Sequence, residues 1–279
     1  EISPGWSVRS PYGVPYALYE RPALGDPVFQ GEIDSLCVEQ KAKTRELNLE
    51  DVLASPTRIH RGAGLPPQHV VLSFDDGPHD PFTALVLDML ARCGIKAHFF
   101  VMGSLVNQPK HAAAIRRYKQ MGHIVGSHSY THANLEKVDY RTARKEIVRG
   151  HLAVESALGE TTPFFRFPFG AGSTSPQLRS ILKEKGLVSM GWTMSSYDTV
   201  YPGTVKVLEH SLGAFLEHSE SGAIFLAHDR KRATVRMLPT LLSYLVEQGY
   251  TFVVIRAGNK ASNQSEEDYL EIFKLNKFI

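Results

Sequence analysis

Short apolar segments alternate with amphipathic segments over most of the chain. The apolar segments are rich in β-branched and aromatic residues and are bounded by turn formers, which is typical of strands buried on both faces. They lie near residues 70–75, 96–102, 124–129, 164–169, 187–194, 223–228 and 251–255. Because the segments between them have helical periodicity, the pattern predicts a parallel sheet covered by helices.

We therefore predict an α/β fold whose main domain spans residues 68–256. About seven β/α units favour an incomplete (β/α) barrel of parallel strands. The first helix of this domain is expected to have Asp80 as its N-cap, Pro81 in its first turn and Gly94 just past its end.

The two ends of the chain differ from this pattern. Residues 1–67 are predicted to form an N-terminal arm and a helical connector packed on the main domain, since residues 1–30 are rich in proline, glycine and aromatic residues and residues 31–54 have a helical composition. Residues 257–279 are predicted to form a polar tether and a C-terminal helix that begins at Ser265 and docks on the main domain.

Composition narrows the class of protein and of partner. The chain has 279 residues, of which 43% are hydrophobic and 22% charged, so it is an ordinary globular protein. Its 31 basic and 29 acidic residues are interspersed, which predicts no nucleic-acid partner. No segment approaches the ~18 to 20 apolar residues of a membrane span. Nothing in the sequence indicates an obligate protein partner, and the oligomeric state is left open.

The two cysteines, Cys37 and Cys93, permit one disulfide bond. Cys93 shares an apolar helical face with Phe82, Leu85, Val86, Met89 and Leu90. We therefore expect Cys93 to be a buried free thiol. The chain begins at Glu1 without a methionine, and a removed secretory leader or a trimmed chain would each explain this start.

The apolar segment 70–74 ends in two adjacent carboxylates, Asp75 and Asp76, followed by Gly77-Pro78. Neighbouring side chains of a strand point to opposite faces, so both carboxylates can reach one site only if the backbone turns. The Gly-Pro pair predicts such a turn. Because α/β folds bind ligands at the carboxyl ends of strands, the pair fits a metal ligand beside a general base. The alternative is a capping aspartate next to a solvated one.

Two histidines follow another predicted strand. His128 and His132 are four residues apart, so a helical turn would place both imidazoles on one side, close enough to share a metal. Two imidazoles and a carboxylate suit zinc or another divalent transition metal, whereas Mg²⁺ and Ca²⁺ prefer more oxygen ligands. We therefore predict a zinc site. Most of the 12 histidines are better interpreted as solvated or partly packed.

Two further residues lie at the same predicted edge. Arg166 stands inside an apolar segment, and a buried arginine is costly unless it meets a carboxylate, for which Asp75 is the natural candidate. His228 ends the segment 223–228 and could serve as a general acid. A structural ion pair and a strand-capping histidine are the alternatives.

These motifs together resemble the signature blocks of the polysaccharide deacetylases, the NodB-like carbohydrate esterases. The four blocks occur in order as Ser73-Phe74-Asp75-Asp76-Gly77, His128-Ser129-Tyr130-Thr131-His132, Arg166-Phe167-Pro168-Phe169 and Leu226-Ala227-His228. The resemblance covers residues 68–256. It implies a distorted (β/α) barrel and the metal-dependent removal of acetyl groups from N-acetylated sugars.

The resemblance also implies residue roles. Asp75 resembles the catalytic base and Arg166 the residue that orients it, while Asp76, His128 and His132 resemble the metal ligands.

For the remaining positions, His228 resembles the general acid and Leu226 a wall of the pocket for the acetyl methyl group. Phe169 stands where the family usually has tyrosine, and the role implied there is a backbone N–H that donates to the oxyanion. Trp192 is expected at the substrate-binding site.

One block departs from the family pattern. After Trp192 the family commonly has Asp-x-x-Asp-Trp, and the matching residues here are interpreted as 195–199, with Ser195 in place of the first aspartate and Thr199 in place of the tryptophan. We expect His228 to lack a carboxylate partner, which would lower its pKa relative to typical family members.

The resemblance therefore predicts a secreted or periplasmic, metal-dependent hydrolase of amide bonds, which acts on N-acetylglucosamine in a glycan. Peptidoglycan is the favoured substrate, as for a peptidoglycan N-acetylglucosamine deacetylase, and chitin-type oligomers are the second candidate. A non-catalytic glycan-binding relative and a cytoplasmic amidase for a small nitrogenous substrate are alternatives. The intact acidic and histidine motifs argue against lost chemistry.

Overall fold

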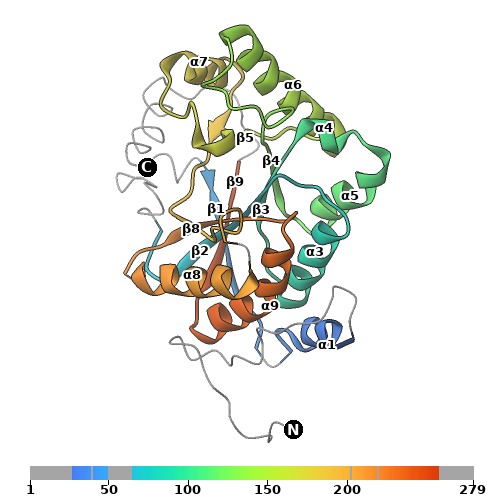
Figure 1. The fold of residues 1–279 in the computed structure, drawn as a ribbon, viewed down its shortest axis with the longest axis vertical. Helices are drawn as coiled ribbons and strands as arrows, with labels where there is room; N and C mark the ends of the chain where they lie inside the picture. Colours follow the sequence, from blue (N-terminus) through green and yellow to red (C-terminus); the bar gives the residue numbers. More distant parts are fainter. Residues whose placement is uncertain (1–26, 39, 50–64, 202, 219, 258–279) are drawn as a thin grey trace, which may run out of the picture.

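In the residues that the computed structural model describes, 27–38, 40–49, 65–201, 203–218 and 220–257, nine strands form one parallel sheet with helices packed around it (Figure 1). The strands are β1 (Lys43–Asn48), β2 (His69–Asp75), β3 (His98–Val101), β4 (Ile124–Ser127), β5 (Phe164–Phe165), β6 (Val188–Ser189), β7 (Met194–Ser195), β8 (Ala223–His228) and β9 (Thr251–Arg256). The helices are α1 (Pro27–Ser35), α3 (Phe82–Cys93), α4 (Gly103–Val106), α5 (Ala112–Gln120), α6 (Tyr140–Leu158), α7 (Pro176–Glu184), α8 (Thr204–Glu217) and α9 (Arg232–Glu247), with 3₁₀ turns η2 (Pro109–His111) and η3 (Pro168–Gly170).

The sheet curves into an incomplete barrel around β2. From β2 it continues through β3, β4, β5 and β6 in one direction and through β8 and β7 in the other, while β9 pairs with the first residues of β2. Among the described strands, β6 and β7 do not pair with each other, so the barrel is open between them. The predicted α/β fold with an incomplete barrel of parallel strands is confirmed.

The predicted strand 187–194 is in fact two short strands, β6 and β7. The carbonyls of Met190 and Gly191, which lie between them, accept hydrogen bonds from the guanidinium of Arg166 at 2.8 and 2.9 Å. Backbone groups that serve a buried side chain are not available for a strand ladder, which explains the interruption.

The helical connector predicted over residues 31–54 is wrong for its second half, because Lys43–Asn48 is the edge strand β1. It pairs with β9 in a parallel register that begins at Lys43 opposite Thr251. Lysine, glutamate and leucine are common in helices, which explains the helical composition of this segment. Most of its side chains are exposed, so it shows no alternation of apolar residues that would have indicated a strand. Pairing with the open edge of β9 outweighs such a local preference.

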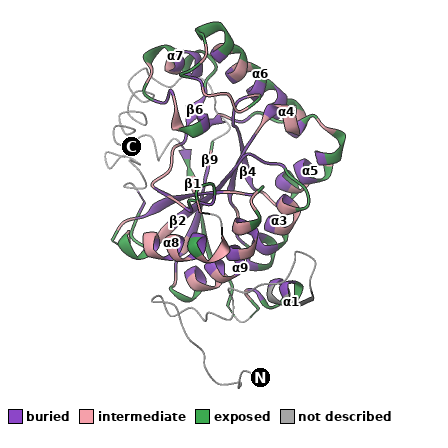
Figure 2. Ribbon diagram, viewed as in Figure 1, coloured by how far each residue is buried: buried purple, intermediate pink, exposed green. Residues whose placement is uncertain are grey.

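Strand alternation separates two apolar cores. On β2, Val70, Leu72 and Phe74 belong to the large cluster between the sheet and the helices, whereas Val71 belongs to a smaller cluster with residues such as Phe100 inside the barrel. Figure 2 shows that the strands other than the edge strand β1, and the sheet-facing sides of the helices, are largely buried. Because alternate residues share a face, Asp75 lies on the same side of β2 as Val71 and is directed toward the barrel interior.

The expectation of a free thiol at Cys93 is wrong, because Cys93 forms a disulfide with Cys37 at a Cα–Cα distance of 5.0 Å. Cys93 is 1% exposed and lies in the apolar core, as its helical face predicted. Helix α1 packs on α3 through Phe29 and Ile33, which brings the following Cys37 to the end of α3.

Of the two predicted ends of α3, the C-terminal one is confirmed and the N-terminal one is wrong. Gly94 terminates the helix in the left-handed conformation, at φ 71°, as expected. The N-cap is Pro81 rather than Asp80, and no side chain caps this end.

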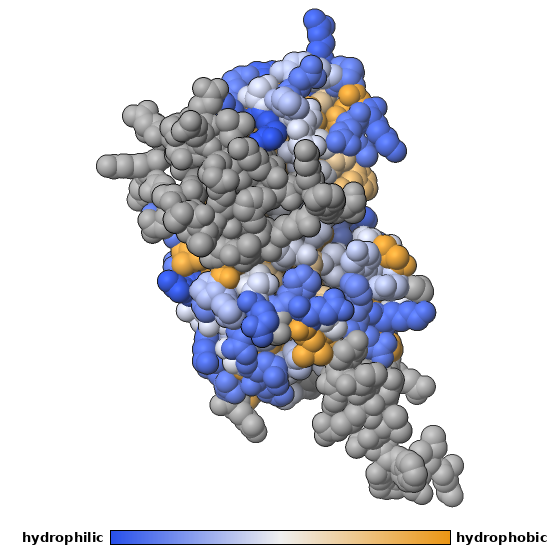
Figure 3. Space-filling view, turned by 90° about the vertical axis from the view of Figure 1, so that its left-hand side faces the viewer, coloured by the Kyte–Doolittle hydropathy of each residue, from blue (hydrophilic) through white to orange (hydrophobic). Residues whose placement is uncertain are grey.

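Residues 1–26 and 258–279 lie outside the described residues, and with them most of the predicted arm and the whole predicted C-terminal helix. None of the described helices is long and apolar enough to cross a membrane. On the face shown in Figure 3, hydrophilic side chains cover most of the described surface and apolar residues form small separate groups.

Candidate active site

The carboxyl ends of neighbouring strands bring the predicted site residues together. Asp75 ends β2 and lies opposite His228, which ends β8, in the parallel register. His128 follows β4, and Arg166 follows β5, whose Phe165 pairs with Ser127. Parallel strands place ligand sites at this edge, so residues far apart in sequence converge there.

Asp75 and Asp76 both face the site because the backbone turns at Asp76 itself. Asp76 has a φ of 72°, in the left-handed region that non-glycine residues seldom adopt. The turn therefore begins one residue before the predicted Gly77-Pro78. Gly77 is needed for packing, since a Cβ there would lie 2.6 Å from a carboxylate oxygen of Asp229.

Asp76, His128 and His132 form a group that could hold a metal ion. Their ligand atoms all lie within 4.8 Å of one another. Oδ1 of Asp76 is 3.1 Å from Nε2 of His132 and 3.6 Å from Nε2 of His128. This Oδ1 is buried and has no hydrogen-bond partner within the described ranges. A buried, orphaned carboxylate oxygen between two imidazole nitrogens fits a divalent cation.

The backbone and side chains around this group orient its members. Nδ1 of His128 lies 2.9 Å from the carbonyl oxygen of Arg166, so a proton on Nδ1 leaves Nε2 free to bind a metal. The second oxygen of Asp76, Oδ2, accepts a hydrogen bond of 2.8 Å from Nε of Arg230. Sequence reasoning missed Arg230, whose only signal was a basic residue two positions after His228.

The helical turn predicted for His128 and His132 is wrong, although the two rings do meet. Residues 128–132 have no regular secondary structure, and Ser129 and His132 have φ values of 62° and 66°. The ring centroids are 4.9 Å apart. Two left-handed residues therefore achieve what a helical turn was expected to achieve.

The predicted pairing of Arg166 with Asp75 is confirmed. The Arg166 guanidinium donates to Oδ1 of Asp75 at 2.8 Å and to Oγ of Ser73 at 2.9 Å, and its carbon lies 4.0 Å from the centre of the Phe100 ring. Arg166 and Asp75 are 1% and 2% exposed, so this is a buried ion pair whose charges are satisfied by several hydrogen bonds. Oδ2 of Asp75 faces His128 at 3.6 Å.

The expectation that His228 lacks a carboxylate partner is wrong, because Asp198 supplies one. Oδ1 of Asp198 is 2.7 Å from Nδ1 of His228, and its Oδ2 accepts the backbone N–H of His228 at 2.8 Å and the hydroxyl of Thr234. The carboxylate that binds His228 therefore comes from the second aspartate of the departing block, Asp198. The serine at position 195 does not leave His228 without a partner.

The carboxylate partner also removes the reason for expecting a low pKa at His228. Burial alone lowers the pKa of His228, but the hydrogen bond and charge of Asp198, together with the charges of Asp75 and Asp76, outweigh it and raise the pKa above its ordinary value. Burial raises the pKa of Asp198, yet the bonds from His228 and Thr234 lower it overall. The pair therefore favours a charged imidazolium beside a carboxylate.

A cleft of about 590 Å³ opens beside these residues. Its lining includes Arg166 and two aromatic residues that were predicted to bind substrate, Phe169 and Trp192. Phe169 has a φ of 61°, is 63% exposed and packs edge-on against His132 at a ring distance of 4.5 Å. Leu226 is buried on β8 and is not among the described residues that line this cleft.

Sequence reasoning missed the α8 side of the cleft. Tyr197 is 45% exposed and contacts the ring of His210 edge-on at 4.6 Å, and both residues line the cleft. The sequence signal for this side of the cleft was an aromatic residue, Tyr197, within the departing block.

Comparison with known proteins shows one matching family model, related sequences and solved structures of similar fold. The model of the family described as polysaccharide deacetylase matches residues 62–208. A peptidoglycan-N-acetylglucosamine deacetylase of Listeria monocytogenes is 35% identical over 188 residues, which are 67% of this chain and 38% of that protein. The chain therefore spans about two fifths of the length of this relative.

Two further matches cover larger shares of the related protein. A chitooligosaccharide deacetylase of Rhizobium leguminosarum bv. trifolii is 32% identical over 167 residues, which are 60% of this chain and 74% of that protein. The solved structure of a peptidoglycan deacetylase of Bdellovibrio bacteriovorus matches with a TM-score of 0.66 and 28% identity, over 84% of this chain and 68% of that one.

Proposed function

Because the chain belongs to the polysaccharide deacetylase family, we propose that it is a metal-dependent N-deacetylase, a hydrolase that removes acetyl groups from N-acetylglucosamine residues of peptidoglycan. The observation that carries this proposal is the orphaned Oδ1 of Asp76 between two imidazoles, next to the Asp75–Arg166 pair and the Asp198–His228 pair. A metal group, a held carboxylate and an imidazole held by a second carboxylate, all at the same edge of the sheet, are the parts that amide hydrolysis needs.

Asp76, His128 and His132 would hold the metal, and we propose zinc because two imidazoles and a carboxylate suit it. Zinc bound there would polarise the acetamide carbonyl and lower the pKa of water. Asp75 acts as the general base, since Arg166 fixes its Oδ1 and leaves Oδ2 directed toward the metal group.

The other residues act on the leaving amine and the oxyanion. His228 acts as the general acid and protonates the amine, because Asp198 holds its Nδ1 and its Nε2 faces the site, 4.0 Å from Oδ2 of Asp76. The N–H of Phe169 donates to the oxyanion, and the left-handed conformation of this residue supports a specialised role. We propose that Trp192 and Leu226 contribute to the substrate pocket.

The choice of peptidoglycan is supported by the names of the Listeria and Bdellovibrio relatives. The Rhizobium relative supports chitooligosaccharides as a second candidate substrate. We also propose an extracytoplasmic location, since a disulfide such as Cys37–Cys93 persists in oxidising compartments and the glycan lies outside the cytoplasm. In a non-catalytic glycan-binding protein there would be no need for a base, a metal group and an acid together.

Acetate release from purified peptidoglycan and from chitin oligomers tests this proposal. We expect release with zinc, none with a chelator, and recovery when zinc is restored. Asp75→Asn is the matched control, because it removes the base and leaves the three proposed ligands in place, so it should bind zinc and release almost no acetate.

Release that persists in the chelator or in Asp75→Asn would refute the proposed mechanism. Release from chitin oligomers but not from peptidoglycan would replace the proposed substrate with the second candidate. Zinc binding without acetate release from either glycan would refute the deacetylase proposal and favour a binding role.

A further inference from the structure

The segment between the two proposed histidine ligands needs external support. Ser129, Tyr130 and Thr131 have no regular secondary structure, and the left-handed conformations of Ser129 and His132 are unfavourable for non-glycine residues. A short segment of this kind has many alternative conformations, and only contacts with its surroundings can select the one in which both imidazoles face Asp76.

One side of this segment is held by α4. The N–H of Gly103 donates to the carbonyl of Ser129 at 3.0 Å, and the N–H of Ser104 donates to the carbonyl of Tyr130 at 2.9 Å. The carbonyl groups of the segment are therefore satisfied by the start of a neighbouring helix.

Two N–H groups of the segment are bound by one carboxylate of α6. Oε2 of Glu146 accepts the N–H of Tyr130 at 3.1 Å and the N–H of Thr131 at 2.7 Å, and Oε1 accepts the Thr131 hydroxyl at 3.0 Å. Bonds to a carboxylate are stronger than bonds between neutral groups. Glu146 thus binds two successive N–H groups and a side chain in the middle of the segment.

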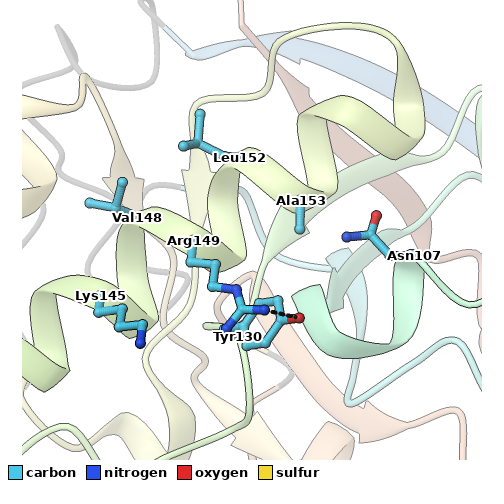
Figure 4. Close-up of a pocket in the computed structure, with 7 residues that line it drawn as sticks. All are labelled: Asn107, Tyr130, Lys145, Val148, Arg149, Leu152 and Ala153. Atoms are coloured by element: carbon cyan, nitrogen blue, oxygen red, sulfur yellow. Dashed lines mark hydrogen bonds between the residues drawn. The ribbon is translucent and has the colours of Figure 1, made fainter.

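The backbone of α6 lies against the same segment. A Cβ on Gly150 would lie only 2.3 Å from the carbonyl carbon of Ser129, so only glycine permits this approach. Arg149 lies 3.7 Å from the centre of the Tyr130 ring and donates to the Tyr130 hydroxyl at 2.8 Å (Figure 4).

Tyr130 is only partly buried. It lines a surface cavity of about 410 Å³ together with residues of α6 that include Val148 and Leu152 (Figure 4). Ser129 is fully buried, but Tyr130 is only partly buried and Thr131 is exposed, so burial alone does not fix this part of the segment and the polar contacts from α6 and α4 contribute.

We propose that Glu146 is a positioning residue that orders the 128–132 segment before metal binding. This inference rests on the proposed function, because it takes Asp76, His128 and His132 as the metal ligands. Glu146 does not belong to that group. Its bonds fix the backbone between the two histidines during folding, so the metal does not have to order the segment on binding.

The test is the zinc affinity of the full chain, measured by competition with a chromophoric chelator. Loss of an outer contact to a metal site typically weakens affinity about 10- to 100-fold, and we expect this loss for Glu146→Ala. Glu146→Gln should recover most of it, because the amide oxygen can accept both N–H groups and the amide NH₂ can donate to the Thr131 hydroxyl.

Glu155→Ala is the matched control. Glu155 is another α6 glutamate whose carboxylate accepts a backbone N–H, that of Thr162 at 3.1 Å, but it does not contact the 128–132 segment. We expect this variant to bind zinc like the wild type even if it is less stable. The absorption spectrum of bound Co²⁺ gives a second readout, and only Glu146→Ala should change it.

Wild-type zinc affinity in Glu146→Ala, or an equal loss in Glu146→Ala and Glu155→Ala, would overturn the inference. A Glu146→Gln variant as weak as Glu146→Ala would do so as well, because the hydrogen bonds would then not account for the effect. A wild-type chain that binds no zinc would instead refute the metal site of the proposed function.

Discussion

Both oxygens of the Asp198 carboxylate bind His228, one at Nδ1 and the other at the backbone N–H. This arrangement fixes the orientation and the tautomer of the ring, so that Nε2 faces the site. We expect Asp198→Asn to lower kcat for acetate release by about 100- to 10,000-fold, the range found when a general acid or its orienting carboxylate is lost.

Ser195→Ala is the control for this prediction, because it alters the same segment without touching His228. It should retain kcat within a few-fold, and both variants should keep the zinc affinity of the wild type. A normal kcat in Asp198→Asn would remove His228 from the mechanism.

Arg166 satisfies the buried carboxylate of Asp75 and two backbone carbonyls. Arg166→Leu leaves these groups unpaired in the barrel interior, and removal of one partner of a buried pair costs about 3–5 kcal/mol. We expect a loss of this size in the free energy of unfolding, measured in urea. Arg144→Leu breaks a pair with Glu184 at the surface and should change the free energy of unfolding little. An equal effect of the two variants would contradict the expected difference between a buried and a surface ion pair.

The location of the site could be predicted from sequence because it depends on local pattern. The buried strand before Asp75 and the strand before His128 were visible in the order of apolar residues, and parallel strands necessarily present their carboxyl ends at one edge. Asp75, His128 and His228 could therefore be placed together before any register was known.

Other features depended on contacts that no local pattern encodes. Asp198 follows an irregular segment in which Tyr197 is left-handed, so its approach to His228 could not be inferred from strand periodicity. The Cys37–Cys93 bond and the pairing of β1 with β9 both join residues far apart in sequence. In each case a long-range partner outweighed what the segment's own composition indicated.

The disulfide links α1 to the end of α3 across a sequence separation of 56 residues. Closing a long loop restricts the unfolded chain, and a native disulfide contributes about 2–4 kcal/mol. We expect the Cys37→Ser and Cys93→Ser double variant to unfold at lower urea concentration by this amount of free energy. Acetate release under native conditions should be unchanged, and unaltered stability would show that the bond does not stabilise the protein by restricting the unfolded chain.

Two buried histidines predict a specific loss of stability in acid. Burial lowers the pKa of His98 and of His123 to about 3. Both rings accept a backbone N–H, since Nε2 of His98 lies 3.0 Å from the nitrogen of Ile255 and Nδ1 of His123 lies 3.1 Å from that of Ala97. An accepting nitrogen carries no proton, so both rings are neutral in the folded protein.

The unfolded chain takes up these protons as the pH falls below 6.5, whereas the folded chain does not until about pH 3. The contribution of these two histidines to the free energy of unfolding is therefore fully present above pH 6.5. It is lost as the pH falls toward 3, by up to about 1.4 kcal/mol per pH unit for each histidine. His98→Gln and His123→Asn keep an acceptor at the bonded position but do not titrate. Each should cost some stability at pH 8 and flatten the decline in unfolding free energy between pH 6 and pH 4. A decline as steep as that of the wild type would mean that other groups cause the acid sensitivity.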